Sequence, residues 1–421
     1  MRNILYQLDD KYLEMKIMDK VSEFIEDRSD EMKETLMELL RYPAIGPDND
    51  GDGEMAKAEY LMNILPKFGF DKIDRYDAPD DRVTSGRRPN IVAVKHGVTD
   101  KNVVIIAHMD IVPSGDLDEW DTDPFEPVYK DGKIYGRGAE DNGQEIVASL
   151  FAAKTLDEMD IDHKNNLKVM LVSDEETGSE YGIDHLLEEG LIHQDDLVIV
   201  PDHSEKNGRQ IEIVEKSALW VKVTTHGIQG HAAGLGRTIN ANRVASRYLL
   251  DVDKRLHESF DEEDELFSPP VSTFEPTKRE LNVPNVNTVP GTDVQYYDCR
   301  ILPTIDLTDV KEVFEKTADE ISKETGAKFE IEYSKEKETP KKTPEDAEVV
   351  IQLKKAVEDV TGEEPGLVGI GGGTVAAHIR ERGIPAVVWC SNDEMAHQSN
   401  EYAHLKYMVK DCKVFVNLVM G

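Results

Sequence analysis

A histidine and an aspartate stand two residues apart at the end of an apolar stretch. Residues Val103 to Ala107 are continuously apolar and predict a buried strand, which His108 and Asp110 follow. Side chains two positions apart in an extended chain point the same way. We therefore expect His108 to bind a metal ion while Asp110 accepts a hydrogen bond from its other ring nitrogen.

Four more acidic or imidazole side chains follow predicted strands or lie in polar turns. Asp141 lies in a glycine-flanked turn, Glu176 and Asp202 each follow a short apolar strand, and His397 lies in a polar loop. A single aspartate in such a place is usually a turn former or a helix cap, and a single histidine is usually a satisfied polar residue. Together with His108, however, they make two histidines and three carboxylates. That set suits a pair of zinc ions when one carboxylate bridges them.

The segments around these residues resemble the M20 metallopeptidases and amidohydrolases, a family that includes aminoacylases, carboxypeptidase G2, acetylornithine deacetylase and succinyl-diaminopimelate desuccinylase. The matching motifs run in order along almost the whole chain: AHMDIVP (107–113), WDTDPFEP (120–127), GKIYGRGAEDNGQ (132–144), SDEETGS (173–179), VPD (200–202), GHAA (230–233) and AHQSNEY (396–402). The stretches RRPNIV, EDNGQ, DCRILP and GIGGGTVAA are similar to an archaeal-type subgroup.

The resemblance implies a role for each candidate ligand. His108 and Asp202 would hold one metal ion, and Glu176 and His397 would hold the other. Asp141 would bridge the two ions. The ions implied are two Zn²⁺, with Co²⁺ or Mn²⁺ as alternatives, because such sites are not selected by affinity alone.

The resemblance also implies two residues that act in the reaction. Glu175 would be the general base that takes a proton from a metal-activated water, and it would then pass that proton to the leaving amine. The alternative for adjacent Glu175 and Glu176 is a charged helix start. His231 matches a histidine of the family's inserted domain, which in dimeric members reaches the neighbouring subunit's site and can stabilise an oxyanion. The alternative for His231 is an exposed turn residue.

Substrate binding is predicted at two places. Asn287 and Arg300 lie where related enzymes bind the substrate carboxylate, and arginine suits that role because its planar fork makes two parallel bonds. Gly372, Gly373 and Thr374 precede a predicted helix, whose first amides can bind a carboxylate. The alternative is a plain tight turn. A phosphate-binding loop is disfavoured because no lysine follows Gly373.

Three further polar residues lie beside these motifs. His203 and Glu205 follow Asp202 and are either additional ligands or exposed loop residues, and we favour the loop. Arg137, in the Gly-Arg-Gly turn, is expected to brace the loop of Asp141 rather than to contact substrate.

The elements that must position these residues alternate between strands and helices as far as residue 200. That alternation predicts an open α/β sheet with a site at its carboxyl edge. From about residue 211 the pattern is that of a compact α+β unit. We expect a zinc-hydrolase-type open mixed sheet flanked by helices, formed by residues 1–212 and 336–421. An inserted α+β lid or dimerisation domain would occupy residues 213–335.

The composition excludes several classes of partner. The 421-residue chain carries 85 acidic and 49 basic residues, a net charge of −36. This charge argues against nucleic acid and anionic membranes as partners. A highly charged N-terminus resembles no signal peptide, no apolar run is long enough for a membrane span, and three cysteines without paired spacing suggest a reducing cytoplasm.

These observations predict a cytoplasmic dinuclear-zinc hydrolase that cleaves an amide bond of an N-acyl amino acid or a small peptide. A carboxypeptidase or dipeptidase is the alternative within enzymes. A non-catalytic metal-binding protein on the same fold is the alternative of another class, and the presence of Glu175 beside a full ligand set argues against it. The expected partners are a small-molecule substrate and a second copy of the chain, bound through the inserted domain.

Overall fold

The computed structural model describes residues 16–203, 208–234 and 236–421, and it divides into two units. The first unit consists of Met1–Ile213, Thr343–Leu367 and Thr374–Gly421. The second unit consists of Val214–Lys342 and Val368–Gly373. The glycines of the predicted substrate loop therefore group with the second unit, and Thr374 groups with the first.

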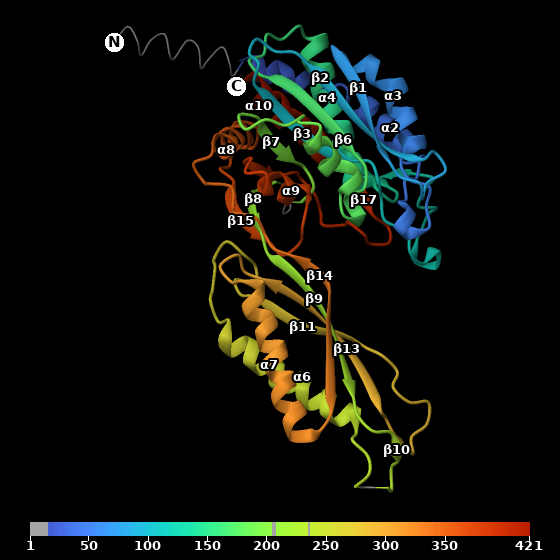
Figure 1. The fold of residues 1–421 in the computed structure, drawn as a ribbon. Coiled ribbons are helices and arrows are strands. Elements are labelled where there is room, and N and C mark those ends of the chain that lie inside the picture. Colours follow the sequence, from blue (N-terminus) through green and yellow to red (C-terminus); the bar gives the residue numbers. More distant parts are fainter. Residues whose placement is uncertain (1–15, 204–207, 235) are drawn as a thin grey trace. The chain divides into compact units, whose positions relative to one another are not determined.

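An eight-stranded mixed sheet forms the centre of the first unit (Figure 1). Its strand order is β1 (Lys72–Pro79), β2 (Arg87–Lys95), β6 (Asn166–Val172), β3 (Asn102–His108), β7 (Leu197–Val200), β16 (Ala386–Val388), β8 (Gln210–Glu215) and β15 (Gly366–Ile370). Strands β6, β3, β7 and β16 run parallel, whereas β1 and β2 form an antiparallel edge. This confirms the predicted open mixed sheet.

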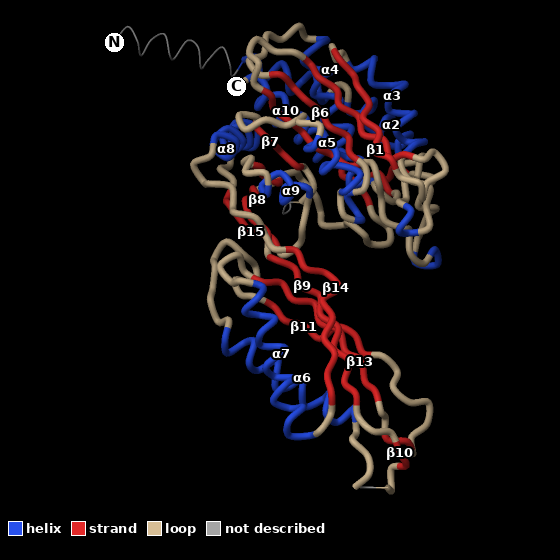
Figure 2. Tube along the Cα trace, in the orientation of Figure 1, coloured by secondary structure: helices blue, strands red, loops and turns tan. Residues whose placement is uncertain are grey.

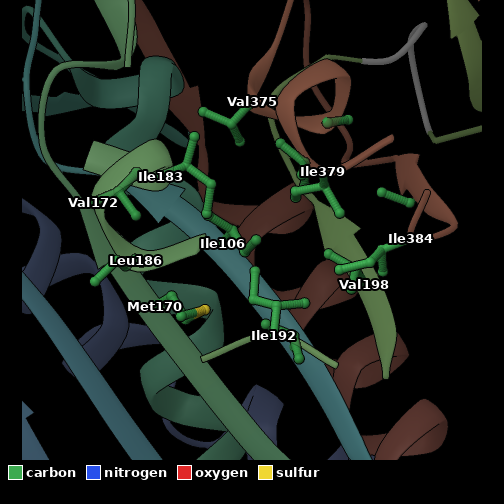
Figure 3. Close-up of a cluster of buried hydrophobic side chains, with 14 of the residues drawn as sticks. Ile106, Met170, Val172, Ile183, Leu186, Ile192, Val198, Val375, Ile379 and Ile384 are labelled. Carbon is green, nitrogen blue, oxygen red and sulfur yellow. The ribbon is translucent and has the colours of Figure 1, made fainter. Parts of the chain in front are cut away.

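Helices cover both faces of this sheet (Figure 2). They are α2 (Ser29–Leu39), α3 (Met55–Ile64), α4 (Gln144–Glu158), α5 (His185–Glu188), α8 (Glu348–Thr361), α9 (Val375–Glu381) and α10 (Leu405–Met420). Every residue of β3 is buried, which requires cover on both sides because successive side chains point to opposite faces. On one face, Ile106 and Val198 belong to an apolar cluster with Ile183, with Leu186 of α5 and with side chains of α9 (Figure 3).

Two local features differ from the predicted elements. Apolar residues at helical spacing predict one helix over residues 1–41. The structure describes this segment from residue 16 and interrupts it at 27–28, so that 16–26 and α2 are separate helices. A small sheet that the sequence did not predict joins β17 (Tyr402–His404), β5 (Lys133–Tyr135) and β4 (Val128–Lys130). Its strands are too short to give a periodic pattern.

The second unit packs two amphipathic helices on a four-stranded antiparallel sheet. The sheet order is β11 (Thr273–Arg279), β13 (Thr292–Ile301), β9 (Ser217–His226) and β14 (Lys328–Lys337), and the helices are α6 (Ala241–Ser259) and α7 (Leu307–Thr325). Alternate residues of β13 are buried, as expected for a sheet with one covered face. A separate two-stranded ribbon pairs β10 (Gly230–His231) with β12 (Thr288–Val289).

Among the described residues, none of the helices combines the length with the apolar character that a membrane span requires. The three cysteines are free and buried.

Candidate metal centre

Three of the predicted ligands lie where parallel strands end. His108 is the last residue of β3, Glu176 follows β6, and Asp202 follows β7. Strand β3 pairs in parallel with both β6 and β7, so their carboxyl ends meet at one edge of the sheet. The order of these strands therefore brings together residues that lie far apart in the sequence.

Asp141 joins two groups of candidate ligands. Its Oδ1 lies 2.7 Å from Nε2 of His108, and its Oδ2 lies 3.2 Å from Nε2 of His397. Asp202 completes the first group, with Oδ1 3.4 Å from Nε2 of His108. Glu176 completes the second, with Oε2 3.0 Å from Nε2 of His397. In each group one atom from each residue lies within 4.8 Å of the others.

The chemistry of these groups fits a pair of divalent cations. Each group offers one imidazole nitrogen and carboxylate oxygens, which are ligands that zinc accepts. Asp141 directs one carboxylate oxygen at each group, an arrangement that suits a carboxylate shared by two cations. The buried Oε1 of Glu176 has no hydrogen-bond partner among the described residues, and a metal ligand is one way to satisfy such an atom.

The ligand groups also perturb one another's protonation. Hydrogen bonds to Asp141 and Glu176 raise the pKa of His397 to about 10. Burial, together with the charge of Asp141, raises the pKa of Glu176 to about 7. In the metal-free protein these side chains therefore share protons, which a metal ion must displace on binding.

Asp110 acts through two different groups, its main-chain carbonyl and its carboxylate. Nδ1 of His108 lies 3.0 Å from the main-chain oxygen of Asp110 but 3.6 Å from its carboxylate. The accepting atom is thus the carbonyl, whereas the sequence had suggested the side chain. The carboxylate instead accepts the amides of Glu175 at 3.1 Å and Glu176 at 3.0 Å. Asp110 therefore fixes the turn that carries the predicted base and a predicted ligand.

Glu175 lies beside the ligand set, at the start of this turn. Burial raises the pKa of its carboxyl well above the ordinary value, and the nearby charge of Asp202 raises it further. A carboxyl group in this environment can accept a proton and hold it near neutral pH.

Two buried carboxylates tie the loop of Asp141 to the loop of His397. Glu401, beyond His397, accepts the amides of Gly138, Glu140 and Asp141 at 2.9–3.1 Å. In the opposite direction, Glu140 accepts the amide of Asp393 at 2.7 Å, and it also accepts that of Met395. We call this arrangement the reciprocal brace.

Arg137 completes the reciprocal brace. Its Nη1 donates to Glu401 at 2.7 Å and to the main-chain oxygen of Gln398 at 3.2 Å. It therefore braces the Asp141 loop indirectly, through Glu401.

A buried charged group that the sequence reasoning missed supports the other side of the centre. Arg88 donates to Glu54, with Nε 2.7 Å from Oε2, and its Nη1 lies 3.5 Å from Asp174. Lys57 donates to the carbonyl of Met109 at 2.7 Å, and burial lowers its pKa to about 8. Arg88 lies in the RRPNIV stretch, but nothing in that pattern indicates that its charge is buried. Charged side chains are almost never fully buried unless they are paired.

Five of the predicted residues lie in the second unit, at two separate places. His231 is in β10, and Asn287 accepts the amide of Ala232 through its main-chain oxygen at 3.0 Å, so the two are neighbours. Arg300 makes two hydrogen bonds to Asp298, and its Nη1 donates to the carbonyl of Gly371 at 3.1 Å. The structure thus brings Arg300 to the glycine loop of Gly372 and Gly373.

The remaining predictions concern loop residues of the first unit. Thr374 caps α9, since its hydroxyl accepts the amide of Ala376 at 3.2 Å. His203 is half-buried, with no hydrogen bond among the described residues. Glu205 lies outside the described residues.

Comparison with known proteins adds independent findings. A family model described as peptidase family M20/M25/M40 matches residues 104–421. An uncharacterized metallohydrolase of Methanocaldococcus jannaschii is 40% identical over 417 residues, covering 96% of this chain and 100% of that protein. A succinyl-diaminopimelate desuccinylase of Nitratiruptor sp. is 27% identical over 393 residues, covering 92% of this chain and 99% of that protein.

Solved structures share the fold. Human carnosine dipeptidase 1 superposes with a TM-score of 0.72 at 18% identity, covering 96% of this chain and 98% of that one. An M20 family metallo-carboxypeptidase from Sulfolobus solfataricus has a TM-score of 0.69 at 20% identity, covering 93% and 98%.

Proposed function

The chain belongs to peptidase family M20/M25/M40, and from that premise we propose that it is a dinuclear-zinc hydrolase of N-acyl amino acids or small peptides. The observation that carries this proposal is the position of Asp141, whose two carboxylate oxygens face two different ligand groups. Such a shared carboxylate suits two ions held close together, and a pair of ions suits hydrolysis of an amide. His108 and Asp202 would hold one ion, and Glu176 and His397 the other.

In the proposed hydrolysis, each residue of the site has a separate role. When bound, the metal pair supplies positive charge that acidifies water and polarises the scissile carbonyl. Glu175 takes a proton from the attacking water on its carboxylate and later gives it to the leaving amine. Asp110 holds the amides of Glu175 and Glu176, so that the base and one ligand keep a fixed separation.

Substrate binding is proposed in the second unit. Arg300 keeps its guanidinium beside Gly371, so the arginine and the loop of Gly372 and Gly373 form one candidate carboxylate site. His231 and Asn287 form the other candidate, and His231 would donate to the oxyanion of the reaction. A homodimer through the second unit would let such residues act on the neighbouring subunit's centre.

The deacylase class is favoured over the exopeptidase class by the curated relatives. A relative that matches nearly the full length is a succinyl-diaminopimelate desuccinylase, and it supports an N-acyl amino acid as the substrate. The dipeptidase and carboxypeptidase among the solved structures keep a peptide substrate as the second candidate. Three buried free cysteines are consistent with the proposed cytoplasmic location.

An activity screen tests the proposal. The full-length protein, loaded with Zn²⁺, Co²⁺ or Mn²⁺, is incubated with N-acetyl amino acids, N-succinyl amino acids and dipeptides, and release of free amine is measured. We expect hydrolysis of at least one class. The Glu175→Gln variant should lose about 10²–10⁴-fold in kcat while two metal ions per chain remain bound, as measured by elemental analysis.

A matched control separates the loss of the base from a general effect on the turn. Glu180→Gln changes an exposed glutamate shortly after Glu175 and should leave kcat unchanged. Hydrolysis that survives in Glu175→Gln would refute the proposed base. Two bound ions without hydrolysis in any substrate class would instead favour the non-catalytic alternative.

A further inference from the structure

Helix α10 presents three lysines to a hollow in the first unit. Lys406, Lys410 and Lys413 are spaced by four and three residues, so they lie on one face of the helix. The hollow has a volume of about 510 Å³ and is lined by residues of the helix over 16–26, of the β4–β5 turn, of α8 and of α10. None of these residues belongs to the candidate metal centre.

Two of the three lysines form no ion pair or hydrogen bond among the described residues, although the charges of Asp411 and Glu145 act on Lys410. Lys413 pairs with Glu26 at 2.5 Å. Lys406 and Lys410 form no ion pair or hydrogen bond within the described part of the chain. Their ammonium groups instead lie 4.7 and 4.9 Å from the centre of the ring of Tyr407. Both ammonium groups therefore lie near the ring of Tyr407.

The lining of the hollow is basic, although the chain as a whole is strongly acidic. The whole protein has a net charge of −36, yet the hollow is lined by three lysines and only one carboxylate, that of Glu26. Like charges four residues apart on a helix destabilise it. Burial also lowers the pKa of Lys410, because its ammonium is partly removed from water. A bound anion would offset both effects.

The rest of the lining indicates what kind of anion fits. Val360, Leu405 and Val409 provide an apolar wall, and Ser22, Ser29 and Tyr129 carry hydroxyl groups that can donate hydrogen bonds to an anion. A volume of this size exceeds that of an inorganic anion and falls within the range of about 300–1,000 Å³ that is typical of small-molecule sites.

We propose that this hollow binds a small organic phosphate or carboxylate. Its acidic group lies between the ammonium groups of Lys406 and Lys410, and its body lies against Val360 and Val409. The site is separate from the metal centre and does not depend on the proposed hydrolase activity.

Calorimetric titration tests this site with two probes, inorganic phosphate and phenyl phosphate. The titrations use the full-length, metal-loaded protein at low ionic strength. We expect saturable binding of one equivalent at the hollow, tighter for phenyl phosphate because of the apolar wall. The Lys406→Gln/Lys410→Gln variant should bind at least about tenfold more weakly, since two charge-assisted contacts are removed. Binding should also weaken as KCl rises from about 20 mM to about 0.3 M.

Controls separate binding at the hollow from binding elsewhere on the protein. Phosphate that binds to the metal ions is present in the wild type and in the double variant, so the difference between them reports the hollow alone. The Lys67→Gln/Lys355→Gln variant removes two exposed lysines elsewhere and should bind as the wild type does. If the double variant proves unstable, the single variant Lys406→Gln, at an exposed position, replaces it. We expect it to lose less binding affinity than the double variant. Equal affinity and stoichiometry in the wild type, Lys406→Gln and the double variant would overturn the proposal.

Discussion

At the scale of single residues, Asp141 is the side chain on which both ligand groups depend. We expect Asp141→Ala to lose tight binding of both metal ions, because each group would be left with two ligands. Asp202→Ala should lose one ion and keep the other, since Glu176 and His397 still share Asp141. Elemental analysis after dialysis, with circular dichroism to verify folding, measures the difference.

An exposed aspartate serves as the control for this prediction. Asp195→Asn, between α5 and β7, should bind two ions as the wild type does. If Asp141→Ala and Asp202→Ala lost the same number of ions, Asp141 would not be a bridge.

The candidate ligands were predictable from the sequence, but the contacts that hold them were not. His108, Glu176 and Asp202 each follow an apolar stretch, so their residue types and positions predict a shared edge. Glu140 and Glu401 bind main-chain amides of distant loops, and no pattern in the sequence identifies an amide as a partner. The predicted contact of Asp110 has a different accepting atom for the same reason, because the direction of a carbonyl depends on how the chain turns.

At the scale of elements, the reciprocal brace holds two ligand loops at a fixed distance. Glu401→Gln should lower the free energy of unfolding by about 3–5 kcal/mol, because it leaves the charge of Arg137 buried without its partner. Glu140→Gln should cost about 1–3 kcal/mol through the amides of Asp393 and Met395. Both variants should also weaken metal binding at the group that contains His397.

Chemical unfolding in the presence and absence of metal measures these effects. Glu394→Gln, an exposed glutamate in the same loop, is the control and should change the free energy of unfolding by less than about 0.5 kcal/mol. Unchanged metal binding in Glu140→Gln would show that the brace does not position His397.

The packing of α4 against α10 should make stability depend on pH. Glu145 of α4 is buried, and its pKa is raised well above the ordinary value by burial and by the charge of Asp411 in α10. The folded protein therefore holds a proton that the unfolded chain releases above about pH 4.3. The contribution of Glu145 to the free energy of unfolding is fully present below about pH 4.3. It decreases by at most about 1.4 kcal/mol per pH unit as the pH rises toward the raised pKa of Glu145.

Glu145→Gln removes this titration, since an amide stays neutral. Relative to the wild type, the variant should gain free energy of unfolding as pH rises from about 5 to about 8, as measured by urea unfolding at each pH. Glu358→Gln, at an exposed position of α8, should show the same pH dependence of the free energy of unfolding as the wild type. If Glu145→Gln showed that same pH dependence, Glu145 would not be the group that holds the proton.

Long elements were predictable from periodicity, and short ones were not. The strand predicted from Val103 to Ala107 matches β3 within two residues, because its continuous burial gives a clear apolar run. The pairing of β17 with β5 joins two strands of three residues each, and each depends on the other for its conformation.

At the scale of the whole molecule, the charge of −36 should govern the response to salt. Repulsion among exposed carboxylates destabilises the folded state, and salt screens it. We expect the Tm to rise between about 0.05 M and about 1 M KCl. A neutral osmolyte at matched osmolality is the control, and an unchanged or falling Tm in KCl would contradict the prediction.

The mixed sheet was predictable from the alternation of strands and helices, but the order of its strands was not. Strand β16 lies between β7 and β8 in the sheet, although it begins only at Ala386 and β8 ends at Glu215. The hydrophobic patterns of these strands are alike, so sequence alone does not specify which of them become neighbours.

The position of β16 has a consequence for biosynthesis. A nascent chain that has emerged only as far as β8 lacks the strand that pairs with β7, and it also lacks His397 and Glu401. The edge of β7 is then unpaired and apolar, which favours aggregation or capture by a chaperone until the C-terminal segment leaves the ribosome. The candidate metal centre is therefore complete only after His397 and Glu401 have left the ribosome, so we expect metal loading to follow the synthesis of this segment.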